Sequence, residues 1–157
     1  MSIPTKIREF LDLHKIAYQF CTHSPAYTAQ GLAHVQHVSG KELAKVVMVV
    51  VKGRMLMTVL PGSHRVEIEQ LDRLLNTQNS RLATEEEFKD LFPDCEVGAM
   101  PPFGNLYNLE VWADSELEKH PTITFNAGTH VETIKMNYAD FHRLVAPRTG
   151  SFSALRH

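Results

Sequence analysis

The sequence predicts a single compact α+β domain. Segments with the apolar spacing of helices alternate along the chain with segments rich in β-branched residues. The length of 157 residues fits one domain with its own core, and neither an internal repeat nor a low-complexity linker divides it. We therefore expect one domain over residues 1–147, followed by a loosely held tail over residues 148–157, where no pattern is recognisable.

Each expected element follows from its apolar spacing or from its end signals. Pro4 suits the first turn of a helix that runs to His14, and Thr28 suits the N-cap of a helix to about His37. Thr84 and the glutamates after it form a capping-box pattern before a helix over 85–91. Further helices are expected over 68–75 and 138–144, and strands over 17–21, 45–51, 55–60, 110–113, 122–126 and 130–136. The strands 45–51 and 55–60 form the clearest hairpin.

Charge and composition exclude several classes of partner. The formal net charge is −2, so a general basic surface that grips nucleic acid is not expected. A local basic region, for which a solvated surface is the simplest interpretation, contains Lys41, Lys45, Lys52, Arg54 and Arg65. No apolar run reaches the roughly 20 residues that span a bilayer, and no secretory signal is visible. Because the chain has only two cysteines, we expect a reduced, cytoplasmic protein. From the net charge and the lack of a long apolar run, we expect it to bind neither DNA nor membranes.

The common catalytic and metal-binding motifs are absent from the sequence. His23, His34 and His37 are the closest group of histidines, but neither a His-Glu-x-x-His pattern nor a Cys-x-x-Cys pair accompanies them. The chain also lacks a Gly-x-Ser-x-Gly elbow, a phosphate-binding P-loop and a dinucleotide fingerprint. We therefore expect no metal and no cofactor.

A loop and a lysine remain as candidates for a site. Residues 98–104 read Gly-Ala-Met-Pro-Pro-Phe-Gly, a combination that predicts a stiff loop whose backbone another molecule can approach. Lys45 stands at the start of the apolar strand 46–51, which holds the backbone firmly while the ammonium group reaches into a cleft. A simple turn and a snorkelling surface lysine are the structural alternatives for these two features.

The order of these segments resembles the YbaK/ProX family of aminoacyl-tRNA deacylases and prolyl-tRNA-synthetase-associated editing domains. The resemblance extends from about residue 17 to residue 147 and rests on short motifs in a shared order. These motifs are His23 and Thr28 in His-Ser-Pro-Ala-Tyr-Thr, Lys45 before its strand, a Gly-x-x-x-Pro loop from Gly98 to Pro102 followed by Phe103 and Gly104, Asp114 after a strand, and Gly128-Thr129-His130 before the closing strand and Asp140-Phe141.

The resemblance implies a mixed, partly barrel-like sheet surrounded by helices, with a pocket for the aminoacylated 3′ end of a mischarged tRNA. It makes Lys45 the catalytic residue, which holds a phosphate or the ester carbonyl. The substrate-binding residues that it implies are His23, Thr28, Gly98, Pro101, Pro102, Phe103, Gly104, Asp114 and His130.

The expected function is therefore a trans-acting deacylase for a small amino acid such as alanine, proline or cysteine, with an aminoacyl-tRNA synthetase as a candidate partner. Ester hydrolysis develops negative charge on the carbonyl oxygen, and a fixed cation stabilises that charge without a nucleophilic triad. Two alternatives stay open. One is a non-catalytic module that binds a tRNA end, a nucleotide or a protein in the same cleft, and the other is a small-molecule hydrolase unrelated to tRNA.

Overall fold

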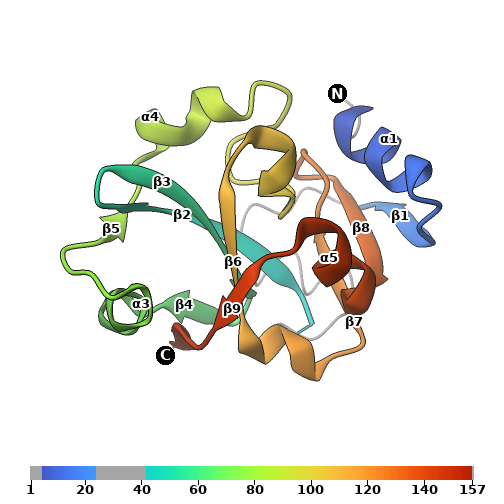
Figure 1. The fold of residues 1–157 in the computed structure, drawn as a ribbon. Helices are drawn as coiled ribbons and strands as arrows, with labels where there is room; N and C mark the ends of the chain where they lie inside the picture. The colour runs from blue at the N-terminus through green and yellow to red at the C-terminus, as the bar shows by residue number, and fades with distance from the viewer. Residues whose placement is uncertain (1–4, 24–41, 157) are drawn as a thin grey trace.

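Helices and strands alternate along the chain as the sequence predicts (Figure 1). The computed structural model describes residues 5–23 and 42–156, and the helix expected over 28–37 lies outside them. The helices are α1 (Thr5–Leu13), α3 (Ile68–Leu75), α4 (Glu85–Phe88) and α5 (Tyr138–Val145), with 3₁₀ turns η1 (Lys89–Leu91), η2 (Gly104–Tyr107) and η3 (Ser115–Lys119). The strands are β1 (Tyr18–Thr22), β2 (Ala44–Val51), β3 (Arg54–Pro61), β4 (His64–Val66), β5 (Arg81–Leu82), β6 (Glu110–Asp114), β7 (Thr122–Asn126), β8 (Glu132–Asn137), β9 (Arg148–Gly150) and β10 (Ser153–Leu155). Within the described ranges, no helix is both long and apolar enough to cross a membrane.

The predicted hairpin β2–β3 is the centre of a five-stranded mixed sheet of order β5-β2-β3-β6-β9. Lys52 and Gly53 connect its strands with φ angles of 52° and 75°. Two left-handed residues match the twist of the paired strands, which explains the tight turn. The β3–β6 and β6–β9 pairs are parallel, whereas β2 pairs antiparallel with both of its neighbours.

A second, antiparallel sheet of order β1-β8-β7 lies beside the start of β2, and β4 pairs separately with β10. A parallel bridge between Leu43 and Thr124 joins β7 to the chain entering β2. The α+β class with mixed strand directions is confirmed. The strands of the described ranges form three hydrogen-bonded sheets and do not close into a barrel.

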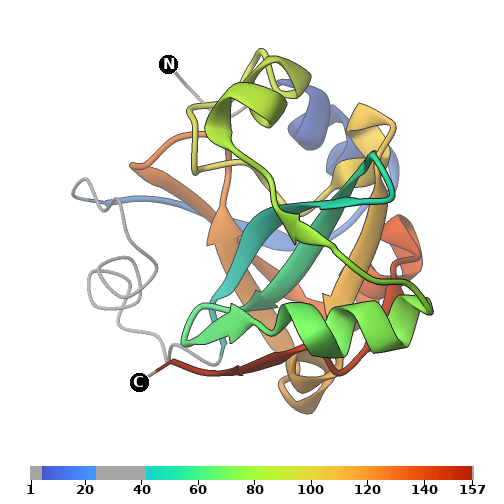
Figure 2. The ribbon, with the colours of Figure 1, turned by 90° about the vertical axis from the view of Figure 1, so that its left-hand side faces the viewer.

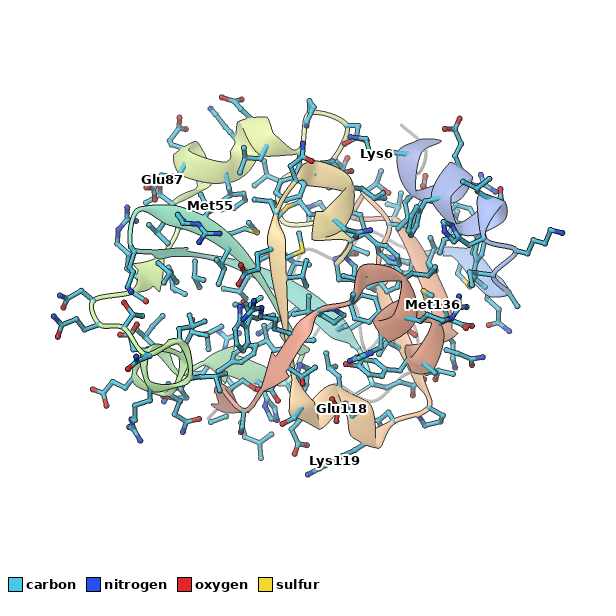
Figure 3. The ribbon with its side chains drawn as sticks, in the orientation of Figure 1. Lys6, Met55, Glu87, Glu118, Lys119 and Met136 are labelled. Atoms are coloured by element: carbon cyan, nitrogen blue, oxygen red, sulfur yellow. The ribbon has the colours of Figure 1, made fainter. Side chains whose placement is uncertain are left out.

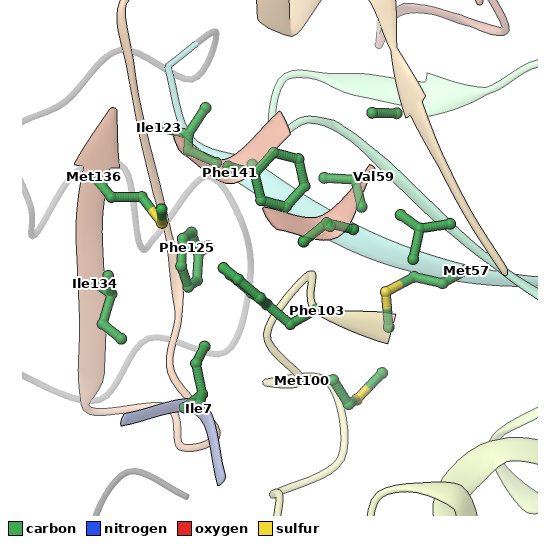
Figure 4. Close-up of a cluster of buried hydrophobic side chains, with 14 of the residues drawn as sticks. Ile7, Met57, Val59, Met100, Phe103, Ile123, Phe125, Ile134, Met136 and Phe141 are labelled. Carbon is green, nitrogen blue, oxygen red and sulfur yellow. The ribbon is translucent and has the colours of Figure 1, made fainter. Parts of the chain in front are cut away.

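The main core lies between the two larger sheets and is rich in aromatic and sulfur-containing side chains (Figure 4). Phe103 is fully buried at its centre, with its ring centroid 5.7 Å from that of Phe125 and 5.6 Å from that of Phe141. Gly104 follows in a confined position, because a Cβ atom there would lie 2.6 Å from Val111 Cγ2. Residues 103 and 104 therefore have clear structural roles.

The capping box predicted at Thr84 is confirmed. The Thr84 N–H donates to Glu87 Oε1 at 2.8 Å, which ties the first turn of α4 to its N-cap. The Glu87 side chain, labelled in Figure 3, also receives two hydrogen bonds from the Arg81 guanidinium at 2.7 Å each. These contacts lower the pKa of Glu87 to about 2, with the Arg81 hydrogen bonds as the largest cause.

The C-terminal residues are ordered, and the loosely held tail expected from the sequence is wrong. Residues 148–150 form β9 against β6, and residues 153–155 form β10 against β4 (Figure 2). Between the two strands, Phe152 is fully buried in a second hydrophobic cluster with Leu71 and Trp112. Burial of a large aromatic side chain supplies the free energy that orders these short strands.

Candidate active site

Lys45 is the second residue of β2 and lies opposite Leu60 of β3. On the other side of the chain, the Leu43–Thr124 bridge joins the entry of β2 to β7. The backbone at Lys45 is therefore held from two sides, as the apolar sequence after it predicts. The side chain is half-buried, which leaves the ammonium group partly removed from water.

The electrostatic surroundings of Lys45 are positive. Burial lowers the pKa of Lys45, and the nearby charge of Arg156 lowers it further. Glu42, the closest carboxylate along the chain, instead accepts a hydrogen bond from Thr122 Oγ1 at 2.9 Å and pairs with Lys135 at 3.2 Å. No carboxylate of the described ranges forms an ion pair with Lys45. Such a cation is available to an anion or to a polarised carbonyl oxygen.

Strand β7 connects Lys45 to the glycine–proline loop. One part of β7 contacts the chain before Lys45, where the Thr124 N–H donates to the Glu42 carbonyl at 3.3 Å. Just beyond the end of β7, the Gly128 N–H donates to the Ala99 carbonyl at 2.9 Å, and the Glu96 N–H donates to the Gly128 carbonyl at 2.8 Å. The fold thus links the predicted catalytic lysine and the predicted substrate loop through one short strand.

The loop around Gly98 is fastened to the turn that contains His130. The His130 N–H donates to Glu96 Oε1 at 2.7 Å, and the His130 ring Nε2 lies 2.8 Å from the Val97 carbonyl oxygen. Gly98 has a φ angle of 85°, and a Cβ atom there would lie 3.4 Å from His130 Cε1. Gly98 is exposed whereas Pro101 and Pro102 are buried, so Gly98 presents its backbone to solvent and the prolines stiffen the loop behind it.

His23 lies at the same end of the molecule as the Gly98 loop. It directly follows β1, and its N–H donates to the Val131 carbonyl at 2.8 Å. The β1–β8 pairing therefore brings His23, Gly98 and His130 together, although they are far apart in sequence. Thr28, the remaining substrate-binding residue predicted nearby, lies outside the described residues.

Asp114 has a structural environment that differs from the predicted substrate-binding role. Its side chain is buried at the end of β6. Oδ1 accepts from the Glu116 N–H at 2.9 Å, while Oδ2 accepts from the Phe152 N–H at 3.0 Å and from Ser153 Oγ at 2.8 Å. These bonds start η3 and anchor the C-terminal strands, which gives Asp114 a structural role, and its substrate-binding role stays a prediction. Phe103 and Gly104 are also buried, and so are Pro101 and Pro102, so the substrate-binding role of these residues stays a prediction.

Two residues near Lys45 were not predicted as site residues. Leu43 and Thr124 form a parallel bridge, and Lys45 and Asn126 each follow it by two residues in the same direction. The Asn126 side-chain oxygen is buried and has no hydrogen-bond partner among the described residues. An asparagine that ends an apolar strand was the available signal. Arg156 was missed because the tail around it shows no periodic pattern.

Comparison with known proteins identifies the family and the fold. A family model described as the aminoacyl-tRNA editing domain matches residues 23–144. Two curated relatives, both named multifunctional Ser/Thr-tRNA deacylase ProXp-y, come from Escherichia coli strains K12 and O157:H7. Each is 25% identical over 140 residues, which cover 86% of this chain and 83% of the relative.

Two crystal structures share the fold. A hypothetical protein aligns with a TM-score of 0.85 and 20% identity, covering 95% of this chain and 99% of its own. A protein described as a candidate trans-editing enzyme for prolyl-tRNA synthetase aligns with a TM-score of 0.79 and 19% identity, covering 98% and 99% of the two chains. The chain belongs to the aminoacyl-tRNA editing domain family and is a YbaK/ProX-type hydrolase of the aminoacyl-tRNA deacylase class.

Proposed function

We propose that the chain is a trans-acting deacylase that hydrolyses the ester between a small amino acid and the 3′ end of a mischarged tRNA. The observation that carries the proposal is the environment of Lys45. This cation is half-buried, forms no ion pair with a described carboxylate, and is connected through β7 to the exposed backbone of the Gly98 loop.

In this mechanism, Lys45 stabilises the charge that develops during attack by water. A water oxygen adds to the ester carbonyl carbon, and the carbonyl electron pair moves onto its oxygen to form an oxyanion. The oxyanion electron pair then re-forms the carbonyl as the carbon–oxygen bond to the ribose breaks. The ribose oxygen takes up the proton that the attacking water loses, and the amino acid leaves with a free carboxyl group. The Lys45 ammonium group lies beside the oxyanion and lowers the barrier, in the manner of an oxyanion-stabilising cation.

The Gly98 loop positions the substrate in the same mechanism. Gly98 carries no side chain and is exposed, so the terminal adenosine or the amino acid can lie directly against its backbone. His130 holds this backbone in place through the Val97 carbonyl, which makes His130 a positioning residue. His23 completes the same end of the site from β1. Because the aminoacyl ester is already reactive, positioning it and the attacking water supplies much of the rate acceleration without a nucleophilic side chain.

The amino acid is proposed to be small. Alanine, proline and cysteine are the substrates that the family resemblance suggests, and the name of the curated relatives adds serine and threonine to the candidates. Selection among such side chains depends on small differences in pocket size, because one methylene changes the transition-state free energy by about 1–3 kcal/mol. Delivery by an aminoacyl-tRNA synthetase belongs to the proposal as a candidate step, because the chain has a formal net charge of only −2.

The test is deacylation by the purified full chain of tRNAs charged with alanine, proline, cysteine, serine or threonine, with phenylalanyl-tRNA as the large control. We expect hydrolysis of at least one small aminoacyl ester well above the buffer rate, and no acceleration for phenylalanyl-tRNA. The same panel is repeated in the presence of the synthetase that recognises each tRNA. Failure to accelerate any ester in either series would overturn the proposal, and binding of uncharged tRNA would then identify a non-catalytic module.

A further inference from the structure

The last strand of the chain brings Arg156 next to the strand that carries Lys45. The Arg156 N–H donates to the Ser63 carbonyl at 3.0 Å, which continues the β10–β4 pairing by one step. The neighbouring Gly62 N–H donates to the Leu43 carbonyl at 2.7 Å, two residues before Lys45. Residues 62 and 63 therefore form a backbone bridge between the two cationic residues, and Figure 2 shows the C-terminal strand beside β4.

Neither cation has a carboxylate partner among the described residues. Four of the described arginines pair with acids, in the pairs Arg54–Glu110, Arg65–Glu67, Arg81–Glu87 and Arg143–Asp140, whereas Arg156 belongs to the four that do not. Arg156 is exposed and forms no such pair within the described ranges, and its charge acts on Lys45. Two like charges close together without a counterion repel each other. A bound anion removes this repulsion energy, so the pair favours anion binding.

Buried hydrogen bonds fix the strand that carries Arg156. Ser153 Oγ donates to Asp114 Oδ2 at 2.8 Å and lies 2.8 Å from His64 Nδ1. Because the serine hydroxyl donates to the carboxylate, it accepts from His64, so this chain of groups is an anchor and not a nucleophilic triad. Phe152 adds a fully buried aromatic ring directly before it. The backbone leading to Arg156 is therefore anchored to the rest of the fold.

On the basis of the proposed function, we infer that Arg156 binds a backbone phosphate of the tRNA 3′ end while Lys45 faces the ester. In a 3′-terminal adenosine, the 5′ phosphate and the esterified hydroxyl lie on opposite sides of one ribose. Two cations whose backbone segments are joined through residues 62 and 63 match this arrangement, since each acts on a different group of the same nucleotide. A guanidinium also donates two parallel hydrogen bonds to phosphate oxygens, which suits Arg156 to this role.

The inference is tested with full-length Arg156→Gln and Arg156→Lys, using Arg73→Gln as the matched control. Arg73 is also an exposed arginine without an ion pair among the described residues, and it lies on α3. The kcat and KM for the best aminoacyl-tRNA are measured at several salt concentrations, and circular dichroism checks the fold. For Arg156→Gln, we expect KM to rise about tenfold with little change in kcat, because a charge-assisted contact is lost.

The salt dependence separates a phosphate contact from a structural effect. The slope of log(kcat/KM) against log[salt] becomes shallower by about 0.7 in Arg156→Gln if one single-strand phosphate contact is removed. Arg156→Lys restores the slope, and Arg73→Gln leaves both KM and slope unchanged. An active wild type with unaltered KM and slope in Arg156→Gln would overturn the inference alone. A wild type that hydrolyses no aminoacyl-tRNA would overturn the proposed function, and this inference with it.

Discussion

Lys45 combines burial with a neighbouring like charge, and both lower its pKa. A lysine loses its proton as the pH rises through its pKa, so Lys45 is expected to become neutral at a lower pH than an ordinary lysine. Glu42 does not oppose this effect, because it pairs with Lys135. We predict that NMR titration of the Lys45 side chain gives a lowered midpoint, and that Arg156→Gln moves the midpoint upward. The same midpoint in the wild type and Arg156→Gln would show that the two charges do not interact.

Gly98 is the residue whose conformation most directly shapes the loop. At a φ angle of 85°, an alanine costs about 1–2 kcal/mol of backbone strain, and its Cβ would meet the His130 ring. We predict that Gly98→Ala lowers kcat/KM by about tenfold or more, because the strain shifts the backbone that faces the substrate. Steady-state kinetics on the preferred aminoacyl-tRNA would measure this effect.

Gly53→Ala is the matched control for that experiment. Gly53 has a similar φ angle of 75°, and a Cβ atom there meets nothing within 4 Å. It lies in the β2–β3 turn, at the opposite end of β2 from Lys45. Gly53→Ala should therefore reduce the melting temperature but leave kcat/KM unchanged. An equal loss of activity in both variants would mean that general backbone strain, and not the loop, explains the result.

At the scale of elements, the C-terminal strands depend on one buried side chain. Phe152 is fully buried in one cluster with Leu71 and Trp112, whereas Leu155 in the same segment is 50% exposed. We predict that Phe152→Ala lowers the free energy of unfolding by about 3–5 kcal/mol, and Leu155→Ala by less than about 1 kcal/mol. Urea unfolding followed by fluorescence of the single tryptophan gives both values. Equal small effects would contradict the anchoring role of Phe152.

The elements that the sequence predicts well are those with local signals. The β2–β3 hairpin has continuous apolar strands and a Lys-Gly turn, and α4 has its capping box. β9 and β10 are three residues each, too short for a periodic pattern. These two strands are held in place by the burial of Phe152 and by Asp114, which accepts hydrogen bonds from Phe152 and Ser153. These donors lie 38 and 39 positions after Asp114 in the sequence. Contacts of this range leave no trace in local spacing.

At the scale of the whole molecule, the fold assembles a site from residues whose sequence separation gives no hint of contact. The motif order predicted that Lys45, Gly98, His130 and His23 belong to one site. In the structure, β7 links Lys45 to the Gly98 loop, and the β1–β8 pair links His23 to the turn that contains His130. The same motif order did not predict that Asp114 and Phe103 are buried, because a motif position does not tell a buried anchor from a lining residue. The formal net charge of −2 likewise concealed a local positive region at Lys45 and Arg156.

Deacylation by Lys45→Ala tests whether the Lys45 cation stabilises the transition state of ester hydrolysis. The variant is compared with the wild type and with Lys89→Ala, which removes an exposed lysine from a surface ion pair with Glu86. Under single-turnover conditions with the preferred aminoacyl-tRNA, we predict that Lys45→Ala loses at least about a hundredfold in rate while Lys89→Ala matches the wild type. Circular dichroism establishes that both variants are folded. A folded Lys45→Ala that hydrolyses the ester at the wild-type rate would show that Lys45 has no catalytic role.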